Sequence, residues 1–223
     1  MTHVHGAAPG PGEVHAPIDT PPYRLVATLG IAGALAGLLV AGVYRVTLPP
    51  IEKHRALVMQ GAIAEVLRQP SRWDTLYLEG SALTKHPRGN ATELERVFVG
   101  YDATGKNIGA AISAGEPGFS EIISLMFGYD VVSGQVLGLK ILEEKETPGL
   151  GDKIERDSTF VRQFAGAKTP VKPVKKRSGS DPTEIDAISG ATISSRAVTR
   201  IINHAVAKWA PLLSAWKPEA TSP

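Results

Sequence analysis

The longest apolar stretch of the chain lies near its N-terminus. Leu25 to Val43 contains no charged residue and is bounded by Arg24 and Arg45. At about 1.5 Å of rise per helical residue, this stretch nearly matches the ~30 Å hydrocarbon core of a bilayer. It exceeds the roughly 7–15 apolar residues of a signal peptide, and no strongly basic segment precedes it. We therefore predict one uncleaved transmembrane anchor over residues 23–46, after a flexible tail over residues 1–22.

Small residues recur every four positions within this anchor, at Gly33, Gly37 and Ala41. Such spacing lets a second helix approach closely inside lipid. Gly and Ala are also common in membrane helices that have no partner, so the pattern leaves a partner helix open.

The pattern changes after Pro49 and Pro50. Residues 51–69 carry apolar side chains at helical spacing, with charges between them and no further proline. This predicts an amphipathic helix that leaves the membrane. We assign residues 47–96 to this helix and to a polar linker that follows it.

Strand-like runs begin at Val97 and come in two pairs, each separated by a short turn. Such pairs predict β-hairpins. The predicted strands cover residues 97–99 with 108–113, and residues 129–132 with 136–142.

Helices are predicted over residues 157–164 and 193–209, and an extended segment over residues 171–176. Hairpins interspersed with helices favour an α+β domain over a parallel, doubly wound sheet. We place this domain at residues 97–210 and a C-terminal tail at residues 211–223.

Composition narrows the chemistry that the domain can perform. The 223 residues include no Cys, which excludes thiolate-held iron–sulfur clusters, Cys-ligated zinc, disulfides and Cys nucleophiles. The formal net charge of +2 gives no electrostatic reason to expect a nucleic-acid partner. The histidines show no metal-ligand spacing, so no metal site is predicted. Redox chemistry would require an organic cofactor or a haem that is not attached through Cys.

A short motif precedes the predicted C-terminal helix. It runs from Asp186 to Thr192 and reads D-A-I-S-G-A-T. Ser189 or Thr192 would cap the helix, and Gly190 lets the backbone approach an anion closely. The unpaired N–H groups and the dipole of a helix start favour a phosphate there. From spacing alone, a plain helix cap is the commoner explanation and a phosphate site is the alternative.

The motif resembles the D-x-x-(S/T)-G-A-(T/S) pattern recognised by the flavin transferases that move FMN from FAD onto a hydroxyl group. The last residue of the pattern is the acceptor, which corresponds to Thr192. Asp186, Ser189, Gly190 and Ala191 match the recognition part of the pattern. The resemblance implies one FMN per chain, held covalently by a phosphoester bond to Thr192.

A second block, at residues 145–154, reads K-E-T-P-G-L-G-D-K-I. Alone, it predicts a tight turn between a strand and a helix. It resembles a signature of the G subunit of Rnf-type electron-transport complexes, and a close variant occurs in the C subunit of sodium-pumping NADH:quinone reductases. In that family the loop lies beside the flavin, which implies that Glu146, Thr147, Gly149 and Leu150 contact FMN.

A third stretch, residues 118–122 followed by residues 127–130, resembles the strand and turn that open the family's FMN-binding domain. The resemblance covers roughly residues 97–209 and the layout of anchor and helix before them. It implies an α+β fold: one N-terminal transmembrane helix, then an FMN-binding domain with antiparallel strands and flanking helices.

The resemblance also implies a function: an electron-carrying subunit of a membrane-bound ion-translocating electron-transport complex, with no independent substrate turnover. Its partners would be the other membrane subunits of the complex and, during maturation, a flavin transferase. The FMN domain is expected on the periplasmic, outer side of the cytoplasmic membrane.

Basic residues near the anchor predict the opposite orientation, because Arg24 precedes it whereas Arg45, Lys53 and Arg55 follow it. We follow the resemblance on this point, since few residues contribute to the count and partner subunits can fix topology.

Two other functions stay open at this point. One is a membrane-anchored regulatory or sensory FMN-binding protein outside an ion pump, and the other is a non-redox assembly anchor. A basic cluster is also unassigned: a solvated loop, an acidic partner or the FMN phosphate would each account for it. Its members are Lys168, Lys172, Lys175, Lys176 and Arg177.

Overall fold

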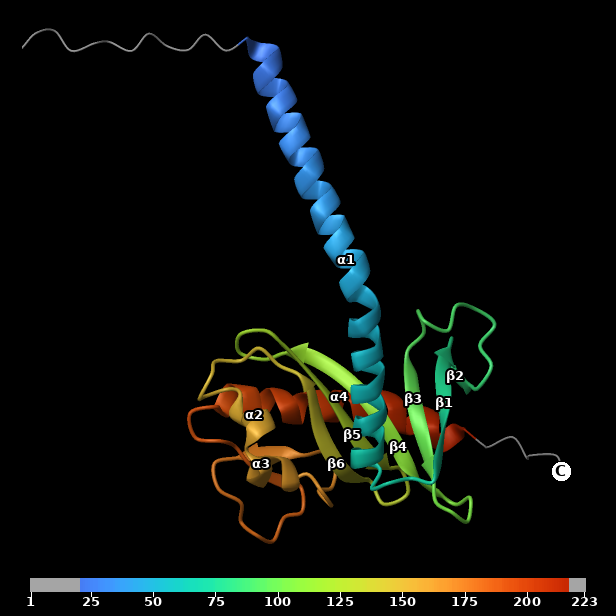
Figure 1. Cartoon of the computed structure of the whole chain (residues 1–223). Coiled ribbons are helices and arrows are strands. Elements are labelled where there is room, and N and C mark those ends of the chain that lie inside the picture. The colour runs from blue at the N-terminus through green and yellow to red at the C-terminus, as the bar shows by residue number, and fades with distance from the viewer. Residues whose placement is uncertain (1–20, 217–223) are drawn as a thin grey trace, which may run out of the picture. The chain divides into compact units, whose positions relative to one another are not determined.

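The computed structural model describes residues 21–216 of the chain (Figure 1). The chain divides into two compact units, residues 1–53 and residues 54–223, and each is described by itself. The predicted tail over residues 1–22 lies almost entirely outside the described residues.

The first unit contains the start of helix α1 (Pro22–Val66). Its apolar side chains are exposed; Leu29 and Leu38, for example, are 74% and 71% exposed. Within residues 21–216, α1 is the one helix long and apolar enough to cross a membrane. A helix that exposes so many large apolar side chains requires an apolar surrounding, as a bilayer provides.

The sequence predicted that the anchor and the amphipathic helix are separate, but α1 continues through Pro49 and Pro50. Each proline forfeits one backbone hydrogen bond. Because the two are adjacent, both losses fall within one turn. The carbonyl groups left without a donor belong to Arg45 and Val46, both at exposed positions where the carbonyls are open to solvation. The loss is therefore local, and the helical residues before and after the two prolines keep α1 continuous.

The second unit is built around a six-stranded antiparallel sheet in the order β2-β1-β3-β4-β5-β6. Both predicted hairpins are confirmed, as β3 with β4 and β5 with β6. The strands are β1 (Arg72–Glu79), β2 (Ala82–Thr84), β3 (Arg96–Tyr101), β4 (Asn107–Pro117), β5 (Ile122–Asp130) and β6 (Gln135–Glu143).

Strands β1 and β2 fall within residues 47–96, where the sequence predicted a helix and a linker but no strand. Only Leu76 of β1 is fully buried, and the other residues of the strand are half-buried or exposed. An edge region with a single buried side chain lacks the alternation that marks a strand in the sequence. Its position is set by pairing with β3, in which Leu76 lies opposite Val97.

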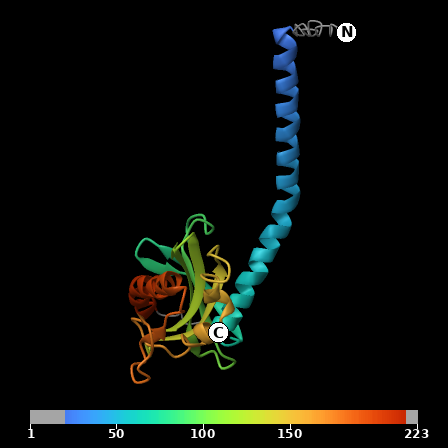
Figure 2. The same cartoon turned by 90° about the vertical axis from the view of Figure 1, so that its left-hand side faces the viewer.

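Side chains alternate between the two faces of the sheet along each strand, so each face can pack against another element, and both faces are covered. Val97 and Val99 belong to the core shared with helix α4 (Thr192–Ala215), whereas Phe98 packs with Ile63 and Val66 at the end of α1. Figures 1 and 2 show α4 and this end of α1 on opposite faces of the sheet. The domain therefore has three layers.

Glycines let the end of α1 lie close against the sheet. A Cβ atom on Gly128 of β5 would clash with the carbonyl oxygen of Val66. A Cβ atom on Gly138 of β6 would lie 3.3 Å from the Cα atom of Val66. These two positions, opposite each other in the β5–β6 pair, form a shallow notch for the last turn of α1.

The remaining elements connect the sheet to α4. They are α2 (Lys153–Arg156), α3 (Ser158–Arg162), and the parallel pair β7 (Lys172–Val174) and β8 (Glu184–Asp186). The predicted helix at residues 157–164 corresponds to α3. Helix α4 runs beyond its predicted end, because Leu213 is buried in the core and holds the last turns in place. Residues 211–215 are thus helical, although the sequence assigned them to a tail. The α+β fold class is confirmed.

Candidate functional site

The two motifs identified in the sequence meet in one pocket, although they are far apart along the chain. Glu146, Thr147 and Leu150 line it from the loop after β6, and the residues from Gly190 to Thr192 line it at the start of α4. Its volume is about 340 Å³. We refer to it as the Glu146 pocket. Six of the nine residues assigned to the cofactor from the sequence therefore share one cavity.

Glu146 connects three segments around this pocket. Its side chain is almost wholly buried, and its Oε1 atom accepts hydrogen bonds of 3.0 Å from the backbone N–H groups of Phe119 and Ser120. Its Oε2 atom accepts a 2.5 Å hydrogen bond from the Ser194 hydroxyl group. A single carboxylate thus joins the turn between β4 and β5, the loop after β6 and the first turn of α4.

Two glycines leave room for this carboxylate. A Cβ atom on Gly118 would lie 2.5 Å from Glu146 Oε1, and one on Gly151 would lie 2.6 Å from the Glu146 Cβ atom. Both positions therefore require glycine for close approach rather than for backbone conformation. Gly151 belongs to the signature block, and its role explains the second glycine of that block.

The charge state of Glu146 follows from the same contacts. Burial raises the pKa of its carboxyl group, but the hydrogen bonds from Ser194, Ser120 and Phe119 outweigh burial. The resulting pKa lies below the ordinary value of 4.5. The pocket therefore contains a fixed negative charge at neutral pH, which disfavours a second anion beside it.

The start of α4 is built differently from the prediction. The N-cap position is Ala191, and no side chain caps the helix there, so neither Ser189 nor Thr192 is the cap. Instead, the Ser195 hydroxyl group accepts a 3.1 Å hydrogen bond from the Ile188 backbone N–H and donates one to the Ala191 carbonyl. This buried serine of α4 thus binds two residues of the motif that precede the helix.

This arrangement leaves the hydroxyl group of Thr192 available. Thr192 is exposed, and its side chain forms no hydrogen bond within residues 21–216. Gly190, two positions earlier, has φ +84°, a left-handed conformation that glycine adopts without strain. The motif thus presents two exposed hydroxyl groups without a hydrogen-bond partner in the described residues, those of Ser189 and Thr192, and of these Thr192 lines the Glu146 pocket, where it is open to a covalent modification.

Three predicted site residues lie outside the Glu146 pocket: Gly149, Asp186 and Ser189. Gly149 supplies the positive φ, +76°, that shapes the turn before Leu150. Asp186 accepts a hydrogen bond from the Arg177 backbone N–H through Oδ1, and its own N–H donates to the Gln163 side chain. It therefore positions the segment before the motif. Ser189 lies in a neighbouring cavity together with Thr192.

An ion-pair cluster fastens α4 to the end of β4. Arg200 Nε donates to Glu116 Oε2 at 2.8 Å, and Arg200 Nη2 donates to the Pro117 carbonyl at 2.6 Å. His204 Nδ1 lies 2.7 Å from Glu116 Oε1. Burial raises the pKa of the Glu116 carboxyl group, but the hydrogen bonds and charges of Arg200 and His204 outweigh this effect. The pKa of Glu116 therefore lies below its ordinary value. The turn that carries Phe119 is therefore held to α4 directly at its N-terminal side and also through Glu146 and Ser194.

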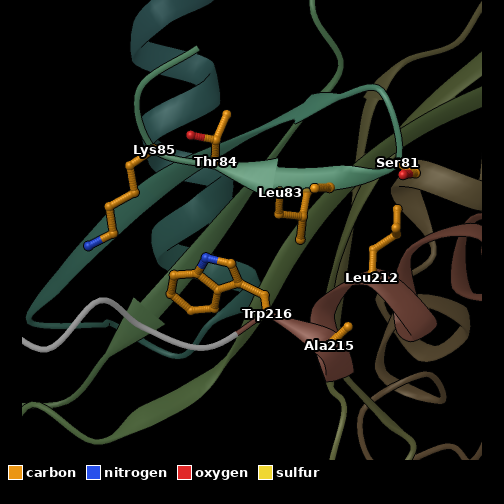
Figure 3. A pocket seen from close by; sticks show the side chains of 8 residues that line it. Ser81, Leu83, Thr84, Lys85, Leu212, Ala215 and Trp216 are labelled. Atoms are coloured by element: carbon orange, nitrogen blue, oxygen red, sulfur yellow. The ribbon is translucent and has the colours of Figure 1, made fainter.

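Another cavity, of about 330 Å³, lies between β2 and the end of α4 (Figure 3). Leu83 points from β2 toward Leu212 and Trp216 in this view. The cavity contains no residue of either sequence motif, and its walls are an edge strand and a helix end. We therefore assign the candidate site to the Glu146 pocket.

Sequence reasoning missed several residues of the site. Ser194, whose hydroxyl group holds Glu146, was not assigned to the site from the sequence. Phe119 and Ile193, which line the pocket beside Leu150, were not assigned to it. Ser194 carried a signal, because it is a polar residue at a position that packs inward, among buried residues of α4. Nothing in the sequence distinguishes Phe119 and Ile193 from residues of the core.

One comparison with known proteins concerns the part of the chain that contains this pocket. Residues 118–207 match the family model described as FMN-binding domain. This range begins at the turn that holds Glu146 and ends within α4, so it contains the whole Glu146 pocket.

Related chains match over most of their length. The G subunit of the ion-translocating oxidoreductase complex from Salmonella typhimurium (strain LT2) is 34% identical over 202 residues, covering 87% of this chain and 94% of the relative. The protein of the same name from Escherichia coli (strain K12) is 32% identical, covering 80% and 86%. That from Methanosarcina acetivorans is 28% identical, covering 82% and 92%.

A solved structure shares the fold. The C subunit of the Na(+)-translocating NADH-quinone reductase from Parabacteroides distasonis superposes with a TM-score of 0.51 at 21% identity, covering 64% of this chain and 78% of that one. At this identity the likeness concerns the fold alone.

Proposed function

We propose that one FMN is attached through a phosphoester bond to Thr192 of this chain, which belongs to the family of G subunits of ion-translocating oxidoreductase complexes. The resemblance found in the sequence is thereby confirmed at the level of the family. The one such apolar helix within residues 21–216, and relatives that are subunits of such a complex, also support a single-pass membrane anchor.

The observation that carries the proposal is the setting of the Thr192 hydroxyl group. It is exposed, free of hydrogen bonds within the described residues, and at the edge of a pocket that holds most of the predicted site residues. The hydroxyls of Ser194 and Ser195 nearby are buried and engaged in hydrogen bonds. Ser189, which precedes α4, is also exposed but does not line the Glu146 pocket, so Thr192 is the exposed hydroxyl at this pocket that is open to modification.

The pocket also fits the ring system of FMN. Phe119, Leu150 and Ile193 surround it with apolar side chains that are 64%, 48% and 53% exposed. Exposed apolar side chains around a cavity are typical of a site whose ligand covers them. Glu146, through its hydrogen bonds, would keep Phe119 and the start of α4 in register around the ring.

FMN held there would supply one- or two-electron transfer, and the chain would position it and keep it from dissociating. We propose that the chain thereby serves as an electron-carrying subunit of a membrane-bound ion-translocating complex and turns over no substrate alone. Its partners would be the other membrane subunits and, during maturation, a flavin transferase. A regulatory FMN-binding protein would instead purify without multispanning subunits.

Substitutions at Thr192 test the attachment. Thr192→Val removes the hydroxyl at nearly constant volume, and Thr192→Ser retains it. After coexpression with a flavin transferase, a denaturing gel should show flavin fluorescence for the wild type and Thr192→Ser but none for Thr192→Val. Fluorescence that survives in Thr192→Val would contradict the assignment, and a dark wild-type band would contradict covalent flavin altogether.

We place the FMN domain on the periplasmic side of the cytoplasmic membrane, as the resemblance implies. A reporter that is active only in the periplasm, fused to the C-terminus, should be active. A reporter active only in the cytoplasm, fused at the same point, should not be. The reverse result would refute this orientation and favour the one predicted from the basic residues.

A further inference from the structure

A second cavity adjoins Thr192 on its other side. Its volume is about 320 Å³, and it is lined by Lys175, Ser189, Thr192 and Arg196, together with small apolar residues. We refer to it as the Lys175 pocket. Thr192 lines both this cavity and the Glu146 pocket and therefore lies where the two meet.

The fold brings both cations to this place. Strands β7 and β8 run parallel with Val174 opposite Asp186, and the Ala187 N–H donates a 2.8 Å hydrogen bond to the Val174 carbonyl. Lys175 directly follows β7 and therefore lies beside the segment that leads to Thr192. Arg196 lies one helical turn after Thr192 on α4 and shares its face.

Both cations are available to a ligand. Neither the Lys175 nor the Arg196 side chain forms a hydrogen bond or an ion pair with any residue in the described part of the chain. Lys172 of the same basic cluster, by contrast, forms an ion pair with Asp181 at 3.5 Å. The members of the basic cluster thus differ, and Lys175 is the one that lines a cavity together with Thr192.

The two pockets differ in charge and polarity on either side of Thr192. The Glu146 pocket has apolar walls and a buried carboxylate that is ionised at neutral pH. The Lys175 pocket has two cations without a partner among residues 21–216. A phosphate group would be repelled from the first and attracted to the second. FMN has the matching division, with an apolar ring system at one end and a phosphate at the other.

We propose that the Lys175 pocket binds the phosphate group of FMN, with Lys175 and Arg196 as its charge partners. This inference rests on the attachment proposed at Thr192. Arg196 offers a planar pair of donors that suits phosphate oxygens, and Lys175 offers a point charge. The ring system is thereby directed to the apolar side of Thr192, which fixes the orientation of the cofactor.

Binding of free FMN and of riboflavin to the full-length Thr192→Val chain tests the proposal, because riboflavin lacks only the phosphate. We expect FMN to bind about tenfold more tightly than riboflavin at low salt, as befits two partly exposed charge contacts. The ratio of the two affinities, FMN over riboflavin, should fall toward one in the triple variant Thr192→Val, Lys175→Ala, Arg196→Ala. In the Thr192→Val chain, the same ratio should decrease at high ionic strength.

Lys176→Ala in the same Thr192→Val background is the matched control, since Lys176 neighbours Lys175 but does not line the pocket. It should leave the preference unchanged. An FMN preference that the Lys175 and Arg196 substitutions do not reduce, or a chain that does not bind FMN at all, would overturn the phosphate site. The mass of the wild-type chain tests the attachment separately, so covalent FMN together with an unaffected preference would refute this inference alone.

Discussion

Replacing Glu146 tests the network that holds the site together. Glu146→Ala leaves three donors without an acceptor: the backbone N–H groups of Phe119 and Ser120 and the hydroxyl group of Ser194. Each hydrogen bond to a charged group contributes about 1.5–3 kcal/mol to stability. Loss of the buried charge removes its own desolvation cost, and water can enter the open pocket. We therefore expect a net loss of about 3 kcal/mol.

Glu146→Gln separates the charge from the hydrogen bonds. Its amide oxygen can still accept from both backbone N–H groups, and the Ser194 hydroxyl can turn to accept from its NH₂ group. We expect a loss of about 1 kcal/mol. For a domain of this size, 1 kcal/mol corresponds to about 2–4 °C in Tm, so Glu146→Ala should melt roughly 6–12 °C below the wild type.

The assay is thermal unfolding of the detergent-solubilised chain, followed by tryptophan fluorescence. Glu143→Gln is the control, because Glu143 is largely exposed and its nearest cation, Lys145, is 3.8 Å away; it should change stability by less than about 0.5 kcal/mol. A Glu146→Ala loss no larger than that of the control would refute the role assigned to the carboxylate.

Acidity provides an independent check on the same residue. The folded-state pKa of Glu146 is lowered, so its contribution is present in full above its ordinary pKa of 4.5 and is lost as the pH falls through the lower folded-state value. The stability difference between the wild type and Glu146→Gln should therefore narrow below pH 4.5. A difference that is constant across this range would contradict the lowered pKa.

Two further substitutions test the packing of the domain. Gly128→Ala should cost about 1–3 kcal/mol in urea unfolding, because its Cβ atom would meet the Val66 carbonyl, whereas Gly61→Ala, at an exposed helical position with open space, should gain about 0.5–1 kcal/mol. Equal changes in stability for Gly128→Ala and Gly61→Ala would refute the close packing of α1 against Gly128. Glu116→Gln should cost at most about 1 kcal/mol, since its partner Arg200 is partly exposed, and the cost should vanish on acidification below pH 4.5 because the pKa of Glu116 is lowered. A pH-independent cost would contradict the ion pair.

The sequence predicted those features that local patterns encode. Both hairpins followed from apolar runs around short turns, and α4 followed from its helical period. The meeting of the two motifs in one pocket is consistent with the resemblance. These elements are specified within a few tens of residues, so a single sequence suffices to recognise them.

What the sequence did not predict depends on contacts between distant residues. Glu146 meets Ser194 across 48 positions and Phe119 across 27 positions, and neither distance leaves a local pattern. The strand β1 takes its conformation from β3. The start of α4 was mispredicted, because no side chain caps it and the Ser195 hydroxyl instead binds the Ile188 N–H and the Ala191 carbonyl, which spacing alone does not indicate.

The mass of the purified full-length chain, coexpressed with a flavin transferase, tests the attachment at Thr192 most directly. We predict an increment of one FMN less one water. Trypsin should place this increment on the peptide from Ser178 to Arg196, which also contains other Ser and Thr residues, and fragmentation should localise it to Thr192. An unmodified mass, or an increment carried by another residue of this peptide, would contradict the account.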